Sequence, residues 1–158
     1  MNELCLVELT VLSPCSVHTC VADVSTSEGI DALVQKARDV FEDSVDCLVN
    51  NVGTNIRKPS VEYSDEEYDI VMNTNLKSTF KLSMKMHPFL KASKTGGSIV
   101  NIGSVAGGNN VAIKSGSVYA MTKAAMNQLC INLACEWAPD NIRGEKITRK
   151  KAIYHVKF

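Results

Sequence analysis

The chain has 158 residues, of which 45% are hydrophobic and 22% charged, and its formal net charge at pH 7 is zero. This length suits one domain, and the balanced charge does not favour nucleic acid as a partner. The apolar runs are too short to span a membrane, and the acidic Glu3 and Glu8 are unlike the start of a secretory signal. We therefore expect a cytoplasmic protein with no nucleic-acid and no membrane partner.

The six cysteines and three histidines give no convincing pattern for a disulfide framework or a metal site. The sequence contains no Cys-x-x-Cys pair. Cys47 falls in a predicted buried strand, and Cys130 and Cys135 fall on a predicted helix. We expect free, mostly buried thiols, as in a reducing compartment, and no metal.

Hydrophobic periodicity predicts the elements of the first half of the chain. Residues 1–18 show no clear period, while residues 17–21 are compatible with a short strand. Apolar residues at helical spacing then predict a helix at about 27–42, opened by a capping box over residues 25–28. An apolar run at 45–50 predicts a buried strand, which a glycine ends.

The second half of the chain continues the alternation. Residues 64–67 form a second capping box, and a long helix follows to about residue 91, broken near Asn73–Asn75. A strand at 98–104 precedes a loop rich in glycine and asparagine, and a helix at 117–137 is stopped by a proline. The order of elements predicts a parallel sheet with crossover helices, as in a doubly wound, Rossmann-like α/β fold.

The end of the chain, residues 146–158, carries five Lys or Arg side chains. Charged ends of this kind are usually solvated, so we predict a frayed end. Contact with an anionic partner is the alternative. No internal repeat or linker divides the chain, so we expect a single domain over residues 1–158.

Tyr119 and Lys123 are the most informative pair, because residues four positions apart share one face of a helix. An ammonium group near a phenol favours the phenolate, so a tyrosine placed this way can exchange a proton with an alcohol or carbonyl oxygen near neutral pH. Ser104 ends a predicted strand, at the sheet edge where ligands bind in open α/β sheets. Taken alone, the pair is more simply explained as an exposed helix pair.

Further motifs give this pair a context. In chain order, the motifs are Asp23-Val24, Asn50-Asn51-Val52-Gly53, Asn75 within Met72-Asn-Thr-Asn-Leu76, Ser104, Tyr119 and Lys123. In order and spacing they resemble the short-chain dehydrogenase/reductase family. Residues 117–143 are similar, more specifically, to plant tropinone reductases and their relatives. The resemblance covers roughly residues 20–143 and implies a Rossmann-like fold.

The resemblance implies four catalytic residues. Tyr119 is the acid or base that exchanges a proton with the substrate oxygen, and Lys123 supports it and holds the nicotinamide ribose. Ser104 binds the substrate oxygen, and Asn75 anchors a water that relays protons to Lys123. The implied activity is that of an oxidoreductase that interconverts a small ketone and an alcohol with NADP(H).

The resemblance also implies a cofactor-binding set. Asn50, Asn51 and Gly53 lie beside the adenosine ribose, and Asp23 meets the adenine ring. Two alternatives remain open at this point. Asp23 is also explained as a polar residue that leads into a helix, and the loop at 107–115, expected at the substrate mouth, is also explained as a plain surface loop.

The ends of the chain depart from the family pattern. The family opens with a strand and a Gly-rich turn that binds the cofactor pyrophosphate, whereas the first glycine here is Gly29. Residues 1–18 and 144–158 diverge, so we expect a partial domain that lacks the first and last strands and is inactive as written. The alternative to an enzyme is a truncated, non-catalytic relative that acts through self-association. The family's subunit interface corresponds to helices 65–91 and 117–137, so we expect a homo-oligomer.

Overall fold

A computed structural model describes residues 6–10, 16–108, 115–148 and 152–156 of the chain. The helices and strands are β1 (Leu6–Thr10), β2 (Val17–Val21), α1 (Ser27–Phe41), β3 (Cys47–Asn50), α2 (Asp65–Met72), α3 (Ser78–Lys91), β4 (Gly97–Ile102), α4 (Ser117–Glu136), β5 (Ile142–Thr148) and β6 (Ala152–Val156). A π-helical turn, Asn73–Lys77, joins α2 to α3. The predicted α/β fold with a parallel sheet is therefore confirmed.

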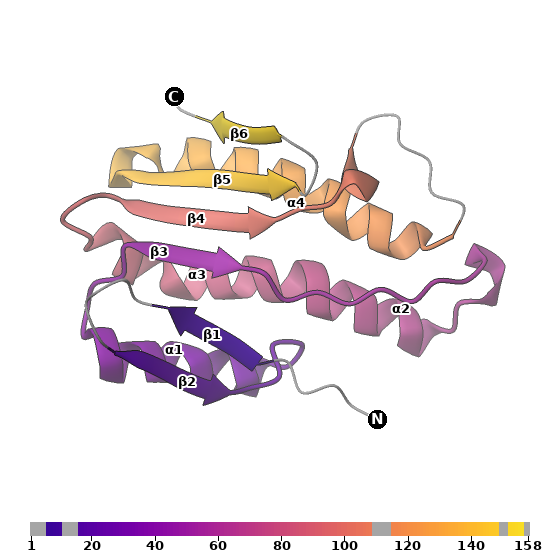
Figure 1. The fold of residues 1–158 in the computed structure, drawn as a ribbon, viewed down its shortest axis with the longest axis horizontal. Helices are drawn as coiled ribbons and strands as arrows, with labels where there is room; N and C mark the ends of the chain where they lie inside the picture. Colours follow the sequence, from indigo (N-terminus) through magenta and orange to yellow (C-terminus); the bar gives the residue numbers. More distant parts are fainter. Residues whose placement is uncertain (1–5, 11–15, 109–114, 149–151, 157–158) are drawn as a thin grey trace.

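The strands form two sheets (Figure 1). The larger sheet has the order β3-β4-β5-β6, in which β3, β4 and β5 are parallel and β6 runs antiparallel to β5. Its register places Asn50 of β3 opposite Asn101 of β4. The smaller sheet pairs β1 with β2 in antiparallel fashion. Among the described residues, β3 therefore has a strand partner on one edge only.

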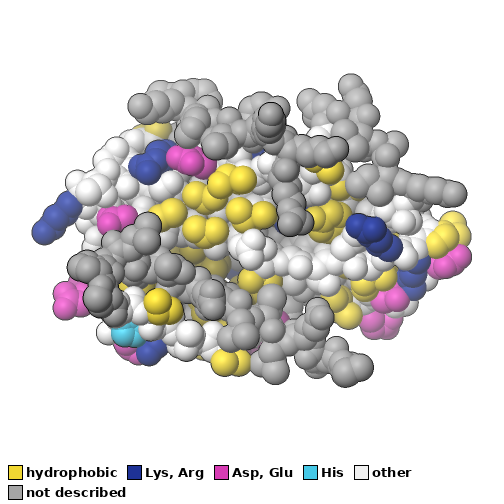
Figure 2. Space-filling model, in the orientation of Figure 1, with side chains coloured by type: hydrophobic (Ala, Val, Ile, Leu, Met, Phe, Trp, Pro, Cys, Tyr) yellow, Lys and Arg dark blue, Asp and Glu magenta, His cyan; other side chains and the backbone are white. Residues whose placement is uncertain are grey.

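The helices α1, α3 and α4 lie behind the strands in Figure 1, so they cover the same face. The main hydrophobic core lies between these helices and the larger sheet and consists of Ile30, Ala37, Val45, Leu48, Leu82, Met86, Phe89, Leu90, Ile99, Leu133, Trp137 and Ile142. Figure 2, in the same view, shows hydrophobic side chains over the middle of the other face. Val49 of β3 and Ile147 of β5 are among the exposed apolar side chains of the strands.

Several local predictions are confirmed. Ser64 caps α2 and exchanges hydrogen bonds with Glu67, which completes the predicted capping box. The break predicted near Asn73–Asn75 is the π-helical turn, which widens the helix without ending it. The helix predicted at 117–137 is α4. Within the described part of the chain, no helix is long and apolar enough to cross a membrane.

The predictions for the two ends need correction. Residues 1–18 showed no period, yet Leu6–Thr10 forms β1 and pairs with β2. The frayed end predicted from Lys146 is wrong, because β5 continues to Thr148 and β6 follows. Charged side chains in β5 break the apolar pattern from which a strand is predicted. A strand is held by its backbone pairing, so it tolerates charge on its exposed face when residues such as Ile142 turn inward.

The first predicted capping box is also wrong in detail. The helix α1 is capped by Thr26, whose hydroxyl oxygen accepts from the N–H of Gly29 at 3.0 Å. Ser25 is engaged elsewhere, since both its N–H and its hydroxyl donate to Oδ1 of Asp23, at 2.9 and 2.7 Å. An aspartate two residues before a serine offers this turn, which moves the helix start by one position.

Candidate active site

Tyr119 and Lys123 share one face of α4, as predicted. The Nζ of Lys123 lies 5.8 Å from the centre of the Tyr119 ring and donates to the backbone oxygen of Ile102 at 2.8 Å. Lys123 is buried, and burial lowers the pKa of its amine below the ordinary value for lysine. Because α4 packs its Lys123 against the end of β4, the pair lies at the carboxyl edge of the parallel sheet.

Ser104 follows β4 by two residues and begins the short 3-10 turn Val105–Gly107. Its Oγ accepts from the N–H of Ala106 at 3.2 Å. The turn lies directly on α4, since a Cβ on Gly107 would lie 2.4 Å from the backbone carbon of Lys123. The side chain of Asn127 also donates to the oxygen of Gly107 at 2.6 Å. The position of Ser104 relative to Lys123 is therefore set by backbone packing.

Asn75 is fully buried in the π-helical turn. Its Oδ1 accepts from the N–H of Thr54 at 2.8 Å, and its Nδ2 donates to the oxygen of Thr54 at 2.9 Å and to Oγ1 of Thr122 at 3.1 Å. Its backbone oxygen accepts from the hydroxyl of Thr79 at 2.8 Å. The side chain thus ties three segments together, and the water relay assigned to Asn75 stays a prediction.

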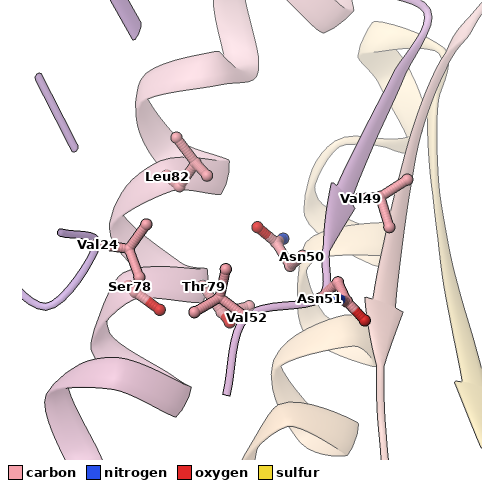
Figure 3. A pocket seen from close by; sticks show the side chains of 8 residues that line it. All are labelled: Val24, Val49, Asn50, Asn51, Val52, Ser78, Thr79 and Leu82. Atoms are coloured by element: carbon pink, nitrogen blue, oxygen red, sulfur yellow. The ribbon is translucent and has the colours of Figure 1, made fainter. Parts of the chain in front are cut away.

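Asn50, at the end of β3, is part of the sheet interior. Its Nδ2 donates to Oδ1 of Asn101 at 2.9 Å and to Oγ of Ser83 at 3.1 Å. Figure 3 shows Asn50 between β3 and α3, whereas Asn51 points to the other side. The neighbouring Gly53 lies over the site, because a Cβ there would be 3.3 Å from Oδ1 of Asn75.

A narrow pocket opens between the end of β3 and α3 (Figure 3). It encloses about 20 Å³ and is lined by Val24, Val49, Asn50, Asn51, Val52, Ser78, Thr79 and Leu82. That volume is close to the space for one water molecule. Asp23 immediately precedes Val24, but its carboxylate is exposed and accepts from Ser25. Asp23 therefore leads into α1, and its contact with an adenine ring stays a prediction.

The structure brings together Gly53, Asn75, Tyr119 and Lys123, with Ser104 carried on the adjoining turn. Asp23 and the Asn50–Asn51 pair lie toward the pocket beside β3. The interior of the predicted substrate loop, residues 109–114, lies outside the described residues.

Sequence reasoning missed three polar residues that support this site. Thr54, Thr122 and Asn127 each bind a residue far away in the chain. The only local signal was a threonine on the buried face of α4. In the part of the chain that the structure describes, no cluster of three metal-ligating side chains occurs. The described cysteines are free, and the prediction that Cys47 is buried is wrong, since it lies exposed on β3.

Known protein sequences match this chain over the residues that form the site. The family model described as short chain dehydrogenase matches residues 4–148. A protein of Arabidopsis thaliana named as a tropinone reductase homolog is 56% identical over 123 residues, which are 78% of this chain and 46% of the relative. The chain spans about half the length of the curated relatives it matches.

Solved structures share the fold. An NADH-dependent reductase responsible for alginate metabolism matches with a TM-score of 0.75 and 28% identity, over 82% of this chain and 54% of that one. A gluconate 5-dehydrogenase from Burkholderia cenocepacia, solved in complex with NADP and tartrate, matches with a TM-score of 0.71 and 25% identity, over 80% of this chain and 48% of that one. The matched fold is therefore one that holds nicotinamide cofactors in these relatives.

Proposed function

Because this chain belongs to the short-chain dehydrogenase family, we propose that its site serves the NADP(H)-dependent interconversion of a small ketone and an alcohol. The observation that carries the proposal is the pair on α4, where the buried ammonium of Lys123 lies 5.8 Å from the centre of the Tyr119 ring. A phenol beside a buried cation is suited to exchange a proton with a substrate oxygen.

Each side chain has a defined task in this proposal. When bound, the cofactor supplies the hydride. Tyr119 donates its proton to the oxygen of the ketone, and the ammonium of Lys123 stabilises the phenolate that remains. Ser104 Oγ already accepts from Ala106 at 3.2 Å, so its own O–H is left to donate to the same substrate oxygen.

The nicotinamide end of a cofactor fits the residues present. An ammonium has three N–H donors, and the bond from Lys123 to Ile102 leaves donors for the ribose hydroxyls. Glycine at position 53 keeps the approach to Lys123 open, since a Cβ there would lie 3.5 Å from Nζ. We assign Asn50 and Asn51 to the adenosine side. The NADP-bound relative supports the choice of NADP, while the NADH-dependent relative makes NADH the comparison to run.

The residues present fit the pyrophosphate part of the cofactor less well. Within the described residues, no Gly-rich turn at a helix N-terminus stands beside the pocket at the end of β3, and this pocket encloses about 20 Å³. A group that carries two phosphates needs a larger, donor-lined space. Occupation of this end therefore requires the pocket to open or requires residues beyond those described.

The experiment is a fluorescence titration of the chain with NADPH and with NADH, followed by assays of ketone reduction with small cyclic ketones. We expect Tyr119→Phe to lower turnover by about 10²–10⁴-fold, because it removes the transferable proton. Tyr68→Phe is the matched control, since Tyr68 is an exposed tyrosine on α2. Unchanged turnover in Tyr119→Phe would refute the proposed role of the pair.

A second candidate is a non-catalytic protein that acts through self-association, and the helical surface favours it. Side chains on α2, α3 and α4 leave apolar area exposed, namely Ile70, Phe80, Met84, Met121 and Ile131. A groove beside them is lined by Met72, Asn73, Leu76, Lys77, Phe80 and Leu129. A surface groove lined mainly by apolar side chains is the kind of feature that marks interaction sites. We infer a homo-oligomer through these helices.

Light scattering after gel filtration tests this second candidate. We expect a dimer or larger species, which Phe80→Glu converts to monomer because it puts a charge into the groove that Phe80 lines. Glu66→Gln on α2 is a control for surface change without loss of apolar area. A chain that self-associates but shows no NADPH binding would favour the non-catalytic candidate over the enzyme.

We also infer a cytoplasmic location. Its support is that Cys20, Cys47, Cys130 and Cys135 are all free, as expected in a reducing compartment. Expression of the chain fused to a fluorescent reporter tests this location, and signal confined to an organelle would contradict it.

A further inference from the structure

Thr122 lies on α4 between Tyr119 and Lys123 and is fully buried. Its hydroxyl donates to the backbone oxygen of Tyr119 at 2.8 Å, a bond that threonine often makes inside a helix. The same Oγ1 also accepts from Nδ2 of Asn75 at 3.1 Å. A threonine that only satisfies its own hydroxyl needs the first bond. The second bond reaches a different helical segment and is therefore the informative one.

Asn75 carries the contact on to the segment after β3. It binds both the N–H and the oxygen of Thr54, at 2.8 and 2.9 Å. Both buried side chains, Asn75 and Thr122, thus have their donors and acceptors engaged. A line of hydrogen bonds runs from Thr54 through Asn75 and Thr122 to Tyr119. Buried polar networks that are fully satisfied hold their members rigidly.

This line joins two parts of the proposed site. Gly53, next to Thr54, would carry a Cβ 3.5 Å from Nζ of Lys123. On the other side, Thr122 precedes Lys123 directly in α4. The bond between Asn75 and Thr122 therefore fixes how far the ammonium of Lys123 stands from the backbone at Gly53.

We propose that Thr122 is a positioning residue, which locks the turn of α4 that carries Tyr119 and Lys123 onto the segment at Gly53–Thr54. The inference rests on the proposed function, because it adds a residue to that same site. The role of Thr122 does not depend on activity, because one hydroxyl oxygen holds two backbone segments in register.

The pKa of Lys123 reports directly on this contact between α4 and the segment at Gly53–Thr54. The Nζ of Lys123 donates to the backbone oxygen of Ile102 and lies over the ring of Tyr119, and burial is the cause of its lowered pKa. If the hydrogen bond between Asn75 and Thr122 is lost, water reaches the ammonium, and the pKa of Lys123 rises toward the ordinary value.

The experiment follows the side-chain carbon resonances of labelled lysine by NMR as the pH is raised, with the signal of Lys123 identified by its loss in Lys123→Arg. Thr122→Val removes the hydroxyl and keeps the shape of the side chain. We expect the midpoint of the Lys123 titration to move to higher pH. Thr122→Ser keeps the hydroxyl, and we expect the wild-type midpoint. If Thr122→Val does not fold, Thr122→Ala replaces it, because it also lacks the hydroxyl and places no methyl group against the amide of Asn75.

Thr79→Val is the matched control. Thr79 is another buried threonine whose hydroxyl binds Asn75, but through the backbone oxygen and from α3 rather than α4. We expect it to cost similar stability and to leave the Lys123 midpoint unchanged. An equal rise in Thr79→Val, no rise in Thr122→Val, or an equal rise in Thr122→Ser would each overturn the proposal.

A kinetic arm separates this inference from the proposed function. Where the chain reduces a ketone, we expect Thr122→Val to lower kcat by about 10–100-fold, with a smaller change in KM and recovery in Thr122→Ser, because misplacing a reacting group slows chemistry more than binding. Absence of any turnover in the unaltered chain counts against the proposed function. The titration of Lys123 needs neither cofactor nor ketone and still decides the role of Thr122.

Discussion

The side of the molecule around β4 and α4 differs from the side around β1, β2 and the outer edge of β3. On the first side, β4 has strand partners on both edges, and the turn after it touches the backbone of Lys123. On the second side, β2 leaves Val17 and Val21 more than half exposed, and the described residues Ala22, Val24 and Leu33 form a small buried cluster. Between the two sides lies the narrow pocket of Figure 3.

The difference shows which part of the proposed site is more fully ordered by the described residues. The residues proposed for proton transfer lie on the first side, where Lys123, Asn75 and Thr122 are all buried and hydrogen-bonded. Asn50 and Asn51, proposed for the adenosine end, lie on the second side, where Asn51 is exposed. Preorganised donors are what a catalytic centre requires. The described residues therefore supply more of the proposed proton-transfer site than of the proposed adenosine site.

The largest expected effect compares one truncation on each side. Leu90 is fully buried in the twelve-residue core, whereas Leu33 belongs to the three-residue cluster. We expect Leu90→Ala to lower the free energy of unfolding by about 4–5 kcal/mol and Leu33→Ala by about 2–3 kcal/mol, because a small cluster can collapse around the gap. Urea unfolding measures both values. Equal losses would show that the two sides are equally well packed.

The next effect concerns the contact between the Ser104 turn and α4. A Cβ at Gly107 would lie 2.4 Å from the backbone carbon of Lys123, and backbone atoms cannot move aside. We expect Gly107→Ala to cost about 1–3 kcal/mol of unfolding free energy through overpacking. Gly53→Ala is the control, since its nearest neighbour is a side-chain oxygen at 3.3 Å. Thermal unfolding of both variants checks the order, and a larger loss in Gly53→Ala would contradict it.

Much of the first side was predictable from local pattern. The spacing of Tyr119 and Lys123, the capping box at Ser64 and the break at Asn73–Asn75 depend on residues close in sequence, and the structure contains all three. These features follow from helix geometry and capping chemistry, which act over one or two turns.

The remaining features depend on partners that sequence does not place. Thr122 binds a residue 47 positions away, and Asn127 binds one 20 positions away. Each looks like an ordinary polar residue of a helix. The basic residues from Lys146 onward made the end of β5 look like part of a solvated tail, but backbone pairing with β4 forms the strand. Long-range pairing is invisible in periodicity, which records only which side of an element is apolar.

A smaller effect concerns the end of the first side that lies away from the proposed site. Asp140 binds Lys91 at 2.7 Å and His87 at 2.8 Å, and the ring of His87 packs on Trp137. Lys91 and then His87 hold the pKa of Asp140 below its usual range. A carboxyl with a lowered folded-state pKa contributes stability above the unfolded value of about 4, and this is lost as the pH falls through the folded value.

We therefore expect Asp140→Asn to lower Tm at pH 7 and to differ less and less from the unaltered chain below about pH 4. Scanning calorimetry between pH 7 and pH 3 measures this difference. Asp31→Asn is the control, because it removes the ion pair of a more exposed aspartate with Lys85. A Tm difference for Asp140→Asn that persists undiminished at low pH would mean that its charge is not the cause.

The smallest effect on stability concerns the free edge of β3. Val49 is 48% exposed on a strand that has one partner among the described residues. Edge strands without charge or proline invite pairing with other chains, and lysine discourages it. We expect Val49→Lys to change the free energy of unfolding by no more than about 0.5 kcal/mol. It should reduce the large species seen by sedimentation at high concentration and leave helix-mediated dimers intact.

Val100→Lys is the matched control, because Val100 lies opposite Val49 in the register but on the interior strand β4. There the charge should cost stability without lowering edge association. If both variants reduced the large species equally, the uncovered sheet face, and not the edge of β3, would be the weak point of the second side.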